Sequence, residues 1–321
     1  VTGAAGFIGY HLAMRLLRRG LRVCGVDSLN DYYDPALKRA RLSELLACGR
    51  FAFIEGDLAD ESLVGRVFAE ASPAVVVHLA AQAGVRYSIE HPRAYIESNI
   101  LGFFNMLEAV RRHPVEHFLY ASSSSVYGNR DTAPFSVRDR VDKPVSLYAA
   151  TKKSDELFAY TYAHLYGVPA TGLRFFTVYG PFGRPDMAYF KFTRAILEGK
   201  PIDVYNGGDM LRDFTYIDDV TACVERMLFV PPKPDETGAP YAVYNIGNSR
   251  PVKLLDFIRA LERALGKKAA LNCMPMQAGD VKKTCADIAE TRRDFGFEPA
   301  TQLDEGLKLF VDWYIEYYEK K

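Results

Sequence analysis

The chain opens on Val1-Thr2-Gly3-Ala4-Ala5-Gly6-Phe7-Ile8-Gly9, a run with a glycine at every third position. Val1-Thr2 is predicted to belong to a strand, and residues 7–19 are predicted to form a helix. A pyrophosphate requires this order of strand, glycine turn and helix, because backbone must approach the phosphates closely and the helix N-terminus presents unpaired N–H groups. A side chain at Gly3 or Gly6 would obstruct that approach. The stretch therefore predicts a dinucleotide-binding turn, against the alternative of a flexible glycine turn.

A second apolar run, residues 21–26, ends in Asp27. A carboxylate at the end of this strand can accept hydrogen bonds from the adenosine ribose and would repel a 2′-phosphate. The expected cofactor is therefore NAD rather than NADP. Taken alone, Asp27 could equally be a turn or cap residue.

Further strands are expected at residues 51–54, 75–79 and 117–120, and each leads into small or polar residues. Strands alternate with helices over roughly the first half of the chain, as in a parallel sheet. The expected fold is α/β: a Rossmann-type doubly wound parallel sheet over residues 1–172, and a smaller mixed α/β lobe over residues 173–321 that binds substrate. The chain can cross back from this lobe to the first domain.

Tyr148-Ala149-Ala150-Thr151-Lys152 is the second informative motif, and it follows the serine-rich run at residues 121–128. Positions i and i+4 share a helix face, so the Lys152 ammonium can lie below the Tyr148 phenol and favour its ionised form. A phenol needs such help to act as a base near neutral pH. The alternative places Tyr148 in the core and Lys152 in a surface pair with Asp155 or Glu156.

With these motifs, the sequence from Gly3 to about Phe297 resembles the extended short-chain dehydrogenase/reductase family, in its nucleotide-sugar epimerase and dehydratase branch. The resemblance implies that Tyr148 is the catalytic base, that Lys152 tunes it and orients the nicotinamide ribose, and that Ser123 binds the substrate hydroxyl. The implied cofactor-binding residues are Gly3, Gly6, Phe7, Ile8, Gly9, Asp27, Asn30, Asp57, Leu58, Leu79, Ala80, Ala81, Gln82, Asn99, Tyr148, Lys152 and Phe176.

The reaction type is suggested by two serines. Dehydratases of this branch carry an Asp-Glu pair before a Val-Tyr-Gly sequence, and this chain has Ser124 and Ser125 there. Serine hydroxyls cannot do that acid/base work. The resemblance then implies oxidation at C4 by hydride transfer to NAD, followed by return of the hydride to the resulting 4-keto sugar.

The segment at residues 174–188 resembles that of branch members that epimerise UDP-glucuronic acid to UDP-galacturonic acid, in which a threonine and an arginine face the C5 carboxylate. Those positions are Thr177 and Arg184 here. A guanidinium fork matches a carboxylate, and it would also hold this group away from the orientation that releases carbon dioxide beside a C4 ketone. The alternative is a loop arginine that pairs with Asp186.

The resemblance places the rest of the UDP-sugar on further candidates. It places Val204 and Tyr205 near the uracil, Arg212 at the diphosphate and Asp280 at the ribose. The other substrate-binding candidates are Arg86, Ser123, Ser124 and Ser125. An arginine found before the Gly-Asp sequence of some relatives is Gln277 here, which puts one phosphate contact in doubt. The position that excludes N-acetyl sugars in some relatives is Thr284, so a 2-acetamido substrate stays open.

Composition sets limits on partners. Forty basic and forty acidic residues give a formal net charge of zero, so nucleic acid is not an expected partner. Five cysteines without a Cys-x-x-Cys pair favour the cytoplasm, the six histidines show no metal-ligand spacing, and no apolar run could span a membrane.

The resemblance implies a homodimer through the helix at residues 95–112 and the helix of Tyr148. Met106, Leu107 and Val110 could face either that interface or the sheet.

Three alternatives stay open. One is oxidative decarboxylation of UDP-glucuronate. Another is 4-epimerisation of UDP-glucose or a UDP-N-acetylhexosamine. The third is a non-catalytic NAD-binding sensor, which would require loss of the tyrosine or the lysine, and both are present.

Overall fold

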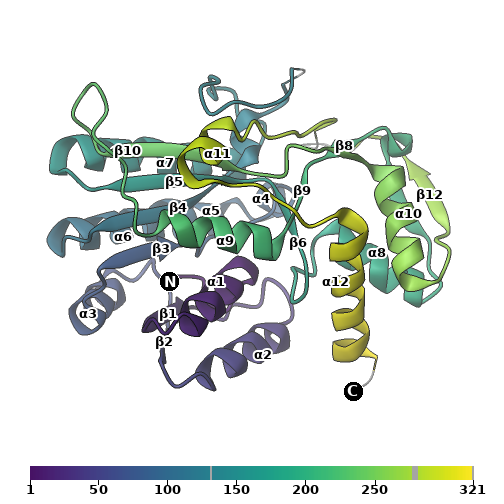
Figure 1. Cartoon of the computed structure of the whole chain (residues 1–321), viewed down its shortest axis with the longest axis horizontal. Coiled ribbons are helices and arrows are strands. Elements are labelled where there is room, and N and C mark those ends of the chain that lie inside the picture. Colours follow the sequence, from purple (N-terminus) through teal and green to yellow (C-terminus); the bar gives the residue numbers. More distant parts are fainter. Residues whose placement is uncertain (131, 277–280, 320–321) are drawn as a thin grey trace. The chain divides into compact units, whose positions relative to one another are not determined.

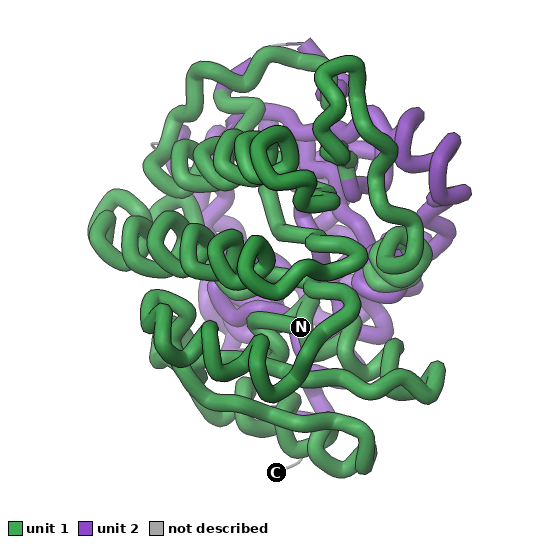
Figure 2. Tube along the Cα trace, turned by 90° about the vertical axis from the view of Figure 1, so that its left-hand side faces the viewer, with its two compact units in different colours: residues 1–128, 137–175, 221–245 green, residues 129–136, 176–220, 246–321 purple. Residues whose placement is uncertain are grey.

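The computed structural model describes residues 1–130, 132–276 and 281–319, and the chain divides into two compact units (Figure 2). Unit 1 comprises residues 1–128, 137–175 and 221–245, and unit 2 comprises residues 129–136, 176–220 and 246–321. Both units are therefore assembled from segments that are distant in the sequence.

Unit 1 is built on one sheet (Figure 1). Its strands are β1 (Val23–Asp27), β2 (Phe51–Glu55), β3 (Val75–His78), β4 (His117–Ser123), β5 (Ala170–Phe175) and β10 (Tyr241–Ile246). The strand order is β2-β1 in one part and β3-β4-β5-β10 in the other. Thr2 joins the two parts, because it forms parallel bridges to both Val26 of β1 and His78 of β3. The pairs β1–β2, β3–β4 and β4–β5 are parallel, as expected for a Rossmann-type sheet.

Helices cover both faces of this sheet. They are α1 (Phe7–Arg18), α2 (Pro35–Leu46), α3 (Glu61–Ala71), α6 (Gly102–Arg112), α7 (Leu147–Tyr166) and α9 (Ile217–Met227). Phe118 and Tyr120 of β4 pack in a core that includes residues of α3, α6 and α7. Successive strand residues face opposite sides, and His117 accordingly contacts the Leu228 carbonyl just after α9. The sheet is therefore doubly wound.

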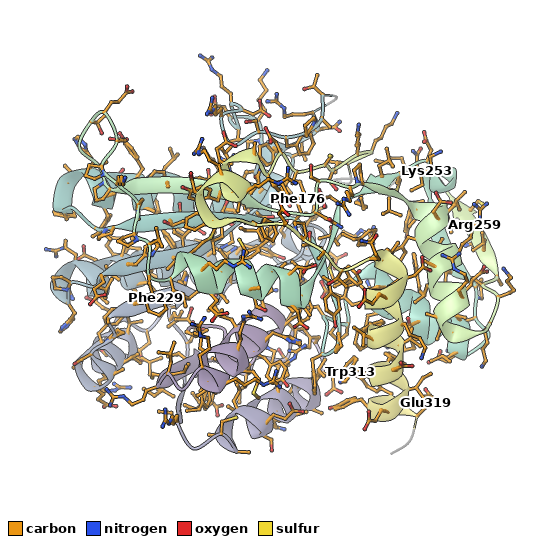
Figure 3. All side chains as sticks on the ribbon, viewed as in Figure 1. Phe176, Phe229, Lys253, Arg259, Trp313 and Glu319 are labelled. Carbon is orange, nitrogen blue, oxygen red and sulfur yellow. The ribbon has the colours of Figure 1, made fainter. Side chains whose placement is uncertain are left out.

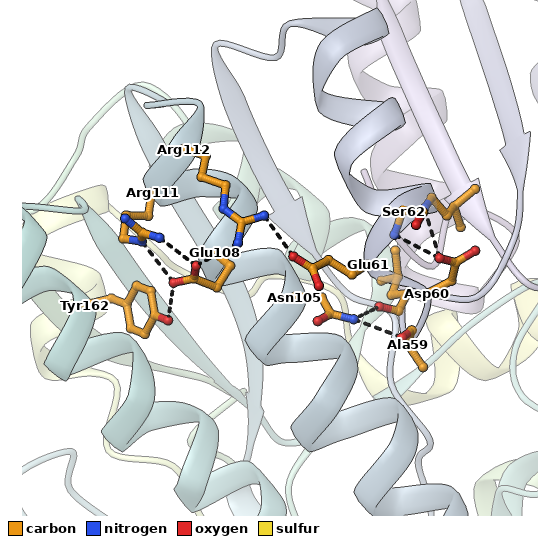
Figure 4. A network of polar contacts seen from close by, with 11 residues as sticks. Ala59, Asp60, Glu61, Ser62, Asn105, Glu108, Arg111, Arg112 and Tyr162 are labelled. Carbon is orange, nitrogen blue, oxygen red and sulfur yellow. Dashed lines mark hydrogen bonds and ion pairs between the residues drawn. The ribbon is translucent and has the colours of Figure 1, made fainter.

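Three apolar residues of α6 face the sheet and not a dimer interface. Met106, Leu107 and Val110 are fully buried in the core with the sheet residues. On the polar side of α6, Glu108 accepts hydrogen bonds from Arg111 and from Tyr162 of α7, while Arg112 pairs with Glu61 of α3 (Figure 4). These contacts hold the three helices side by side.

The helix expected at residues 95–112 is not one regular α-helix. The short helices α4 (Tyr87–Glu90) and α5 (Pro92–Tyr95) come first, followed by a π-helical segment, η1 (Ile96–Leu101), and then α6. The π turn buries Asn99, and such turns often occur at functional sites. A 3₁₀ turn, η2 (Ser124–Tyr127), follows β4.

Unit 2 is a mixed α/β lobe, and its described residues form three two-stranded pairings. In parallel pairs, β6 (Thr177–Tyr179) joins β9 (Phe214–Tyr216) and β7 (Ile202–Tyr205) joins β12 (Leu271–Met274), while β8 (Leu211–Arg212) and β11 (Val252–Lys253) are antiparallel. Its helical segments are α8 (Ala188–Leu197), η3 (Asn206–Gly208), α10 (Leu254–Leu265), α11 (Ala289–Phe295) and α12 (Leu303–Tyr318). Nowhere in the described ranges is a helix long and apolar enough to cross a membrane.

Asp213 organises the centre of unit 2. Its carboxylate is fully buried and accepts backbone N–H groups from Asn248 (2.7 Å), Ser249 (3.0 Å) and Ala286 (2.7 Å). Burial raises the pKa of Asp213, and the three amide donors counteract that rise. One side chain thus binds two backbone segments, at residues 248–249 and at residue 286, beside β9.

Asp213→Ala is expected to destabilise unit 2 by about 3 kcal/mol or more, because three buried amides lose their acceptor. The single tryptophan, Trp313, lies on α12 of the same unit (Figure 3), so its fluorescence can follow urea unfolding of this unit. The exposed neighbour Asp209→Ala serves as the control and should change stability by at most about 0.5 kcal/mol. Equal effects of the two variants would contradict the role given to Asp213.

Candidate functional site

The glycine turn at the start of α1 has the shape that an anion requires. Gly3 has a φ of +68°, and a Cβ on it would lie 2.8 Å from the Ala80 nitrogen. A Cβ on Gly9 would lie 2.0 Å from the Gly3 carbonyl oxygen. The N-cap residue of α1 is Gly6. Because glycine has no side chain, the N-cap residue offers no side-chain acceptor to the N–H groups in the first turn of the helix. The turn therefore fits a pyrophosphate at a helix N-terminus.

Asp27 lies at the end of β1 and binds this turn. Its carboxylate accepts the N–H of Ala5 (3.0 Å) and of Leu29 (2.9 Å). Each carboxylate oxygen has a second lone-pair direction, so these bonds are compatible with the predicted ribose contact. Arg41, which is fully buried on α2, donates to the Ala5 carbonyl oxygen (2.9 Å) and supports the turn from the other side.

The other candidates near this edge differ in exposure. Asn30 accepts a hydrogen bond from Lys38 (2.6 Å), and the exposed Asp57 accepts the N–H of Ala59 (2.9 Å). Leu58 is buried in the core of unit 1. Phe7 is buried in the first turn of α1, next to Ile8. The segment Leu79, Ala80, Ala81 and Gln82 follows β3, where a parallel strand would open onto a ligand.

Asn99 connects that segment to the helix that carries the second motif. Its amide forms two hydrogen bonds with the backbone of Gln82, accepting from the N–H (2.8 Å) and donating to the carbonyl oxygen (3.1 Å). The same amide donates to the Thr151 hydroxyl on α7 (3.0 Å). The segment after β3 and the Tyr148–Lys152 helix are therefore held together by one buried side chain.

Tyr148 is half-buried near the start of α7, where Ser146 caps the helix by accepting the N–H of Ala149. Its ring lies edge-on to that of Tyr95, with centroids 6.0 Å apart. The Tyr95 hydroxyl donates to the carbonyl oxygen of Ala83 (2.9 Å). The loop after β3 and the catalytic candidate thus share one aromatic support.

Lys152 forms an ion pair with Asp155, with 3.0 Å between Nζ and Oδ2. The sequence alternative placed such a pair at the surface, but these side chains are only 2% and 0% exposed. His78 ends β3 nearby, and burial, followed by the charge of Lys152, lowers its pKa to about 3. His78 is therefore a neutral core residue bonded to Thr2 (2.9 Å).

A buried network fixes the end of β4. Ser122 donates to Glu156 (2.7 Å), and Arg174 holds the same carboxylate in a bidentate pair (2.7 and 2.8 Å). Burial disfavours the ionised form of Glu156, but Arg174 outweighs it and keeps the pKa of this carboxyl below its usual range. Arg174 also donates to Tyr127, whose hydroxyl donates to Asn245. The serine run is thus held rigidly.

The remaining serines lie at the end of this strand. Ser123 is buried, and its hydroxyl accepts the N–H of Ser125 (3.1 Å). Ser124 and Ser125 are half-buried in the 3₁₀ turn against which α7 packs. Unit 1 therefore gathers the glycine turn, the segment after β3, the serines and the Tyr148 helix at the carboxyl ends of its strands. Arg86 is exposed just before α4.

In unit 2, Thr177 begins β6 and Arg184 lies on the loop that follows. The Arg184 guanidinium forms a bidentate pair with Asp186, with Nε–Oδ1 3.0 Å and Nη2–Oδ2 2.6 Å. The alternative pairing considered for Arg184 is therefore present, at side chains that are about a quarter exposed. In this conformation the guanidinium fork of Arg184 is occupied by the Asp186 carboxylate.

The loop that carries Arg184 is fixed by aromatic packing. Phe182 has a φ of +54°, an unusual value for a bulky residue, and its ring lies 4.9 Å from that of Trp313. The Tyr189 hydroxyl accepts the backbone N–H of Arg184 (3.1 Å). A Cβ on Gly183 would lie 2.3 Å from that hydroxyl, so only glycine fits there. The loop is therefore held by α8 and α12.

The other substrate candidates are also in unit 2. Val204 is buried in β7 beside the half-buried Tyr205, and Arg212 donates to the carbonyl oxygens of Leu211 and Lys282. Thr284 is buried, and its hydroxyl accepts the N–H of Asp213. Phe176 is also buried in unit 2, within 3.2 Å of where a Cβ on Gly247 would lie. Asp280 and Gln277 lie outside the described residues.

Comparison with family models matches residues 1–247 to the NAD dependent epimerase/dehydratase family. The chain belongs to this family. Among residues 1–130, 132–276 and 281–319, no group of three or more His, Cys, Asp or Glu side chains could hold a metal ion.

Members of the family resemble the chain over nearly its whole length. Protein CapI of Staphylococcus aureus is 53% identical, covering 100% of this chain and 99% of its own. UDP-glucuronate 4-epimerase 1 of Arabidopsis thaliana is 50% identical, covering 99% of this chain and 76% of its own. The crystal structure of UDP-glucuronic acid 4-epimerase from Bacillus cereus with UDP-glucuronic acid and NAD is 34% identical, with a TM-score of 0.90 and coverages of 99% and 98%.

Sequence reasoning missed several supporting residues of this family member. Arg41 and the Glu156–Arg174 pair have no motif that predicts their burial. For Tyr95, the sequence indicates only that a helix begins there. The one available signal was the charge pattern on α7, where Asp155 stands three positions after Lys152 and shares its helix face.

Arg174→Met is expected to destabilise unit 1 by about 3–5 kcal/mol at pH 7, because it leaves the Glu156 carboxylate buried and unpaired. The native pair stabilises the fold above about pH 4 and loses this contribution as pH falls through the depressed pKa of Glu156. The destabilisation should therefore shrink on acidification. Urea unfolding followed by circular dichroism at pH 7 and in acid measures it.

The exposed Arg22→Met is the control for the arginine substitution, with an expected change of at most about 0.5 kcal/mol. A penalty for Arg174→Met that is the same at both pH values would show that its charge is not what matters.

Proposed function

We propose that the chain is a NAD-dependent 4-epimerase that interconverts UDP-glucuronic acid and UDP-galacturonic acid. The observation that carries this proposal is the gathering of the glycine turn, the serine run and the Tyr148–Lys152 helix at the carboxyl ends of the strands of unit 1. Arg184, whose guanidinium is paired with Asp186, is the proposed partner of the substrate carboxylate. The close relatives named UDP-glucuronate 4-epimerase and the solved relative with UDP-glucuronic acid and NAD support the same substrate.

The residues that would hold NAD fit it. The glycine turn would accept the pyrophosphate, Asp27 at the end of β1 would bind the adenosine ribose, and the segment from Leu79 to Gln82 would border the nicotinamide. When bound, NAD would accept a hydride from C4 of the sugar and, as NADH, return it.

The protein's part of the reaction is proton transfer at the C4 hydroxyl. Tyr148 in its phenolate form removes this proton while Ser123 hydrogen-bonds the same oxygen, and the Lys152 ammonium stabilises the phenolate. Loss of this proton, together with loss of the C4 hydride that bound NAD would accept, would give a 4-keto sugar. Tyr148 then returns the proton to O4 after the opposite face of the ketone has been presented. Ser124 and Ser125 supply no acid or base, so no water is eliminated from the sugar.

Proton NMR of UDP-glucuronic acid with the purified protein tests this function. The expected result is the appearance of UDP-galacturonic acid without net NADH. A UDP-pentose would instead assign oxidative decarboxylation. Conversion of UDP-glucose alone would assign a neutral-hexose epimerase, for which a structural relative exists in UDP-glucose 4-epimerase of Thermotoga maritima, 30% identical with a TM-score of 0.87.

Arg184→Gln is expected to raise KM for UDP-glucuronic acid by about 100-fold, because a charge-assisted bond to the carboxylate is lost. Inhibition by UDP, which lacks the carboxylate, should change less than about twofold. Arg194→Gln, an exposed arginine on α8, removes the same charge as a control. Release of carbon dioxide per turnover should also rise in the Arg184 variant. A variant with the KM of wild type and no added release of carbon dioxide would contradict both the carboxylate-binding and the protective role of Arg184.

We also propose a homodimer formed by α6 and α7. Apolar side chains with exposed fractions of 36% to 61% lie along this face of unit 1, namely Ile96, Leu101, Phe104, Leu157, Phe158 and Leu165. Such a concentration favours a protein partner, and a two-fold interface would place both helices against their copies.

Leu157→Glu is expected to convert the dimer to a monomer, because it places a charge in the centre of this apolar face. Sedimentation velocity measures the change. Leu46→Glu, on the exposed side of α2, is the matched control and should remain dimeric. A wild-type protein that sediments only as a monomer would refute the dimer.

The cytoplasm is the compartment we propose. All five cysteines are free thiols, which is the usual state in a reducing compartment.

A further inference from the structure

The proposed mechanism does not use Asp155, although this residue is the nearest acid to the catalytic lysine. Asp155 follows Lys152 by less than one turn of α7, and its Oδ2 accepts a 3.0 Å hydrogen bond from Nζ. Both side chains are shielded from water, with exposed fractions of 0% and 2%. Two opposite charges are therefore held together where neither can be solvated.

The carboxylate of Asp155 is not satisfied by other donors. Its second oxygen, Oδ1, is buried and has no hydrogen-bond partner. Burial raises the pKa of Asp155 to about 7, although Lys152 pulls it in the other direction. Above that pH, the carboxylate is ionised and Lys152 is its counter-charge.

The surrounding groups cannot replace Asp155. Glu156, next on α7, is engaged by Arg174, Ser122 and Lys153. His78 of β3 is neutral, since its pKa is lowered to about 3, and Tyr120 of β4 has a pKa raised well above its ordinary value by burial. The phenol of Tyr148 is the group on which Lys152 acts. Asp155 is therefore the one anion among these neighbours that is available to Lys152.

We propose that Asp155 is a positioning residue that keeps Lys152 protonated and directed along α7 at alkaline pH, so that the charge acting on Tyr148 persists during turnover. This inference rests on the proposed function of Tyr148 and Lys152. Its physical basis is the cost of a buried ammonium: a lysine removed from water and left without an anion gives up its proton at a much lower pH than an exposed lysine.

The test is the pH dependence of kcat at saturating UDP-glucuronic acid, for wild type and Asp155→Asn. The amide has the same shape as the carboxylate and keeps an oxygen acceptor, but it carries no charge. The alkaline pH at which kcat falls to half is expected to be lower in Asp155→Asn by about one unit or more. Asp155→Glu, which restores the anion, should return this pH toward the wild-type value.

The matched control is Asp235→Asn, an exposed aspartate of unit 1 that binds its own loop. Its alkaline half-maximum should equal that of wild type. A purely structural role for Asp155 would lower kcat at every pH without moving the half-maximum, and that result would overturn the proposal. If Asp155→Asn does not fold, Asp155→Ser provides the same uncharged comparison.

Failure of the substrate assignment can be told apart from failure of this inference. If wild type does not convert UDP-glucuronic acid, the proposed function is wrong, and the same pH profiles are measured with the sugar nucleotide that wild type does convert. A shift in the Asp155→Asn profile with that substrate would still support the counter-ion role, and an unshifted profile would still refute it.

Discussion

The amide of Asn99 is the interaction on which the arrangement of unit 1 depends. Its two hydrogen bonds to the backbone of Gln82 fix the segment after β3, and its third bond, to Thr151, fixes the helix of Tyr148 and Lys152. The same segment packs against Gly3, where no Cβ would fit. The glycine turn and the helix of Tyr148 and Lys152 are thus linked through one buried side chain, which lies in a π-helical turn.

The buried carboxylates of Glu156, Asp213 and Asp155 differ in the hydrogen-bond donors that surround them. Glu156 is fully satisfied by a bidentate arginine and a serine, so it stays ionised and gives rigidity to the serine strand. Asp213 is satisfied by backbone amides and organises unit 2. Asp155 has one partner and one unsatisfied oxygen, so its protonation is the most sensitive to pH. The least satisfied of these acids is the one paired with Lys152.

Much of unit 1 could be predicted because its signals are local. Glycine spacing, strand-end polar residues and the Tyr-x-x-x-Lys spacing each follow from backbone geometry, and β1 to β4 occur where the apolar runs predicted them. No apolar run predicted β5 or β10, and β10 lies in the part of the chain that the sequence assigned to the second lobe. The π turn could not be predicted, since a single extra residue in a helical turn leaves no periodic signature in the sequence at residues 96–101. The burial of Arg41 and Arg174 was equally hidden, because a charged residue is expected at the surface until its partner is known. In unit 2, Asp213 separates the short strands β8 and β9, and its carboxylate binds the backbone of residues 248 and 286.

The central claim is that the hydrogen removed from C4 returns to the same carbon. Conversion of UDP-glucuronic acid labelled with deuterium at C4, in ordinary water, measures this directly by mass spectrometry and proton NMR of the product. The account predicts that UDP-galacturonic acid retains the deuterium at C4. Replacement of the label by hydrogen from water would contradict it, because the epimers would then interconvert by proton exchange at carbon rather than by hydride removal and return.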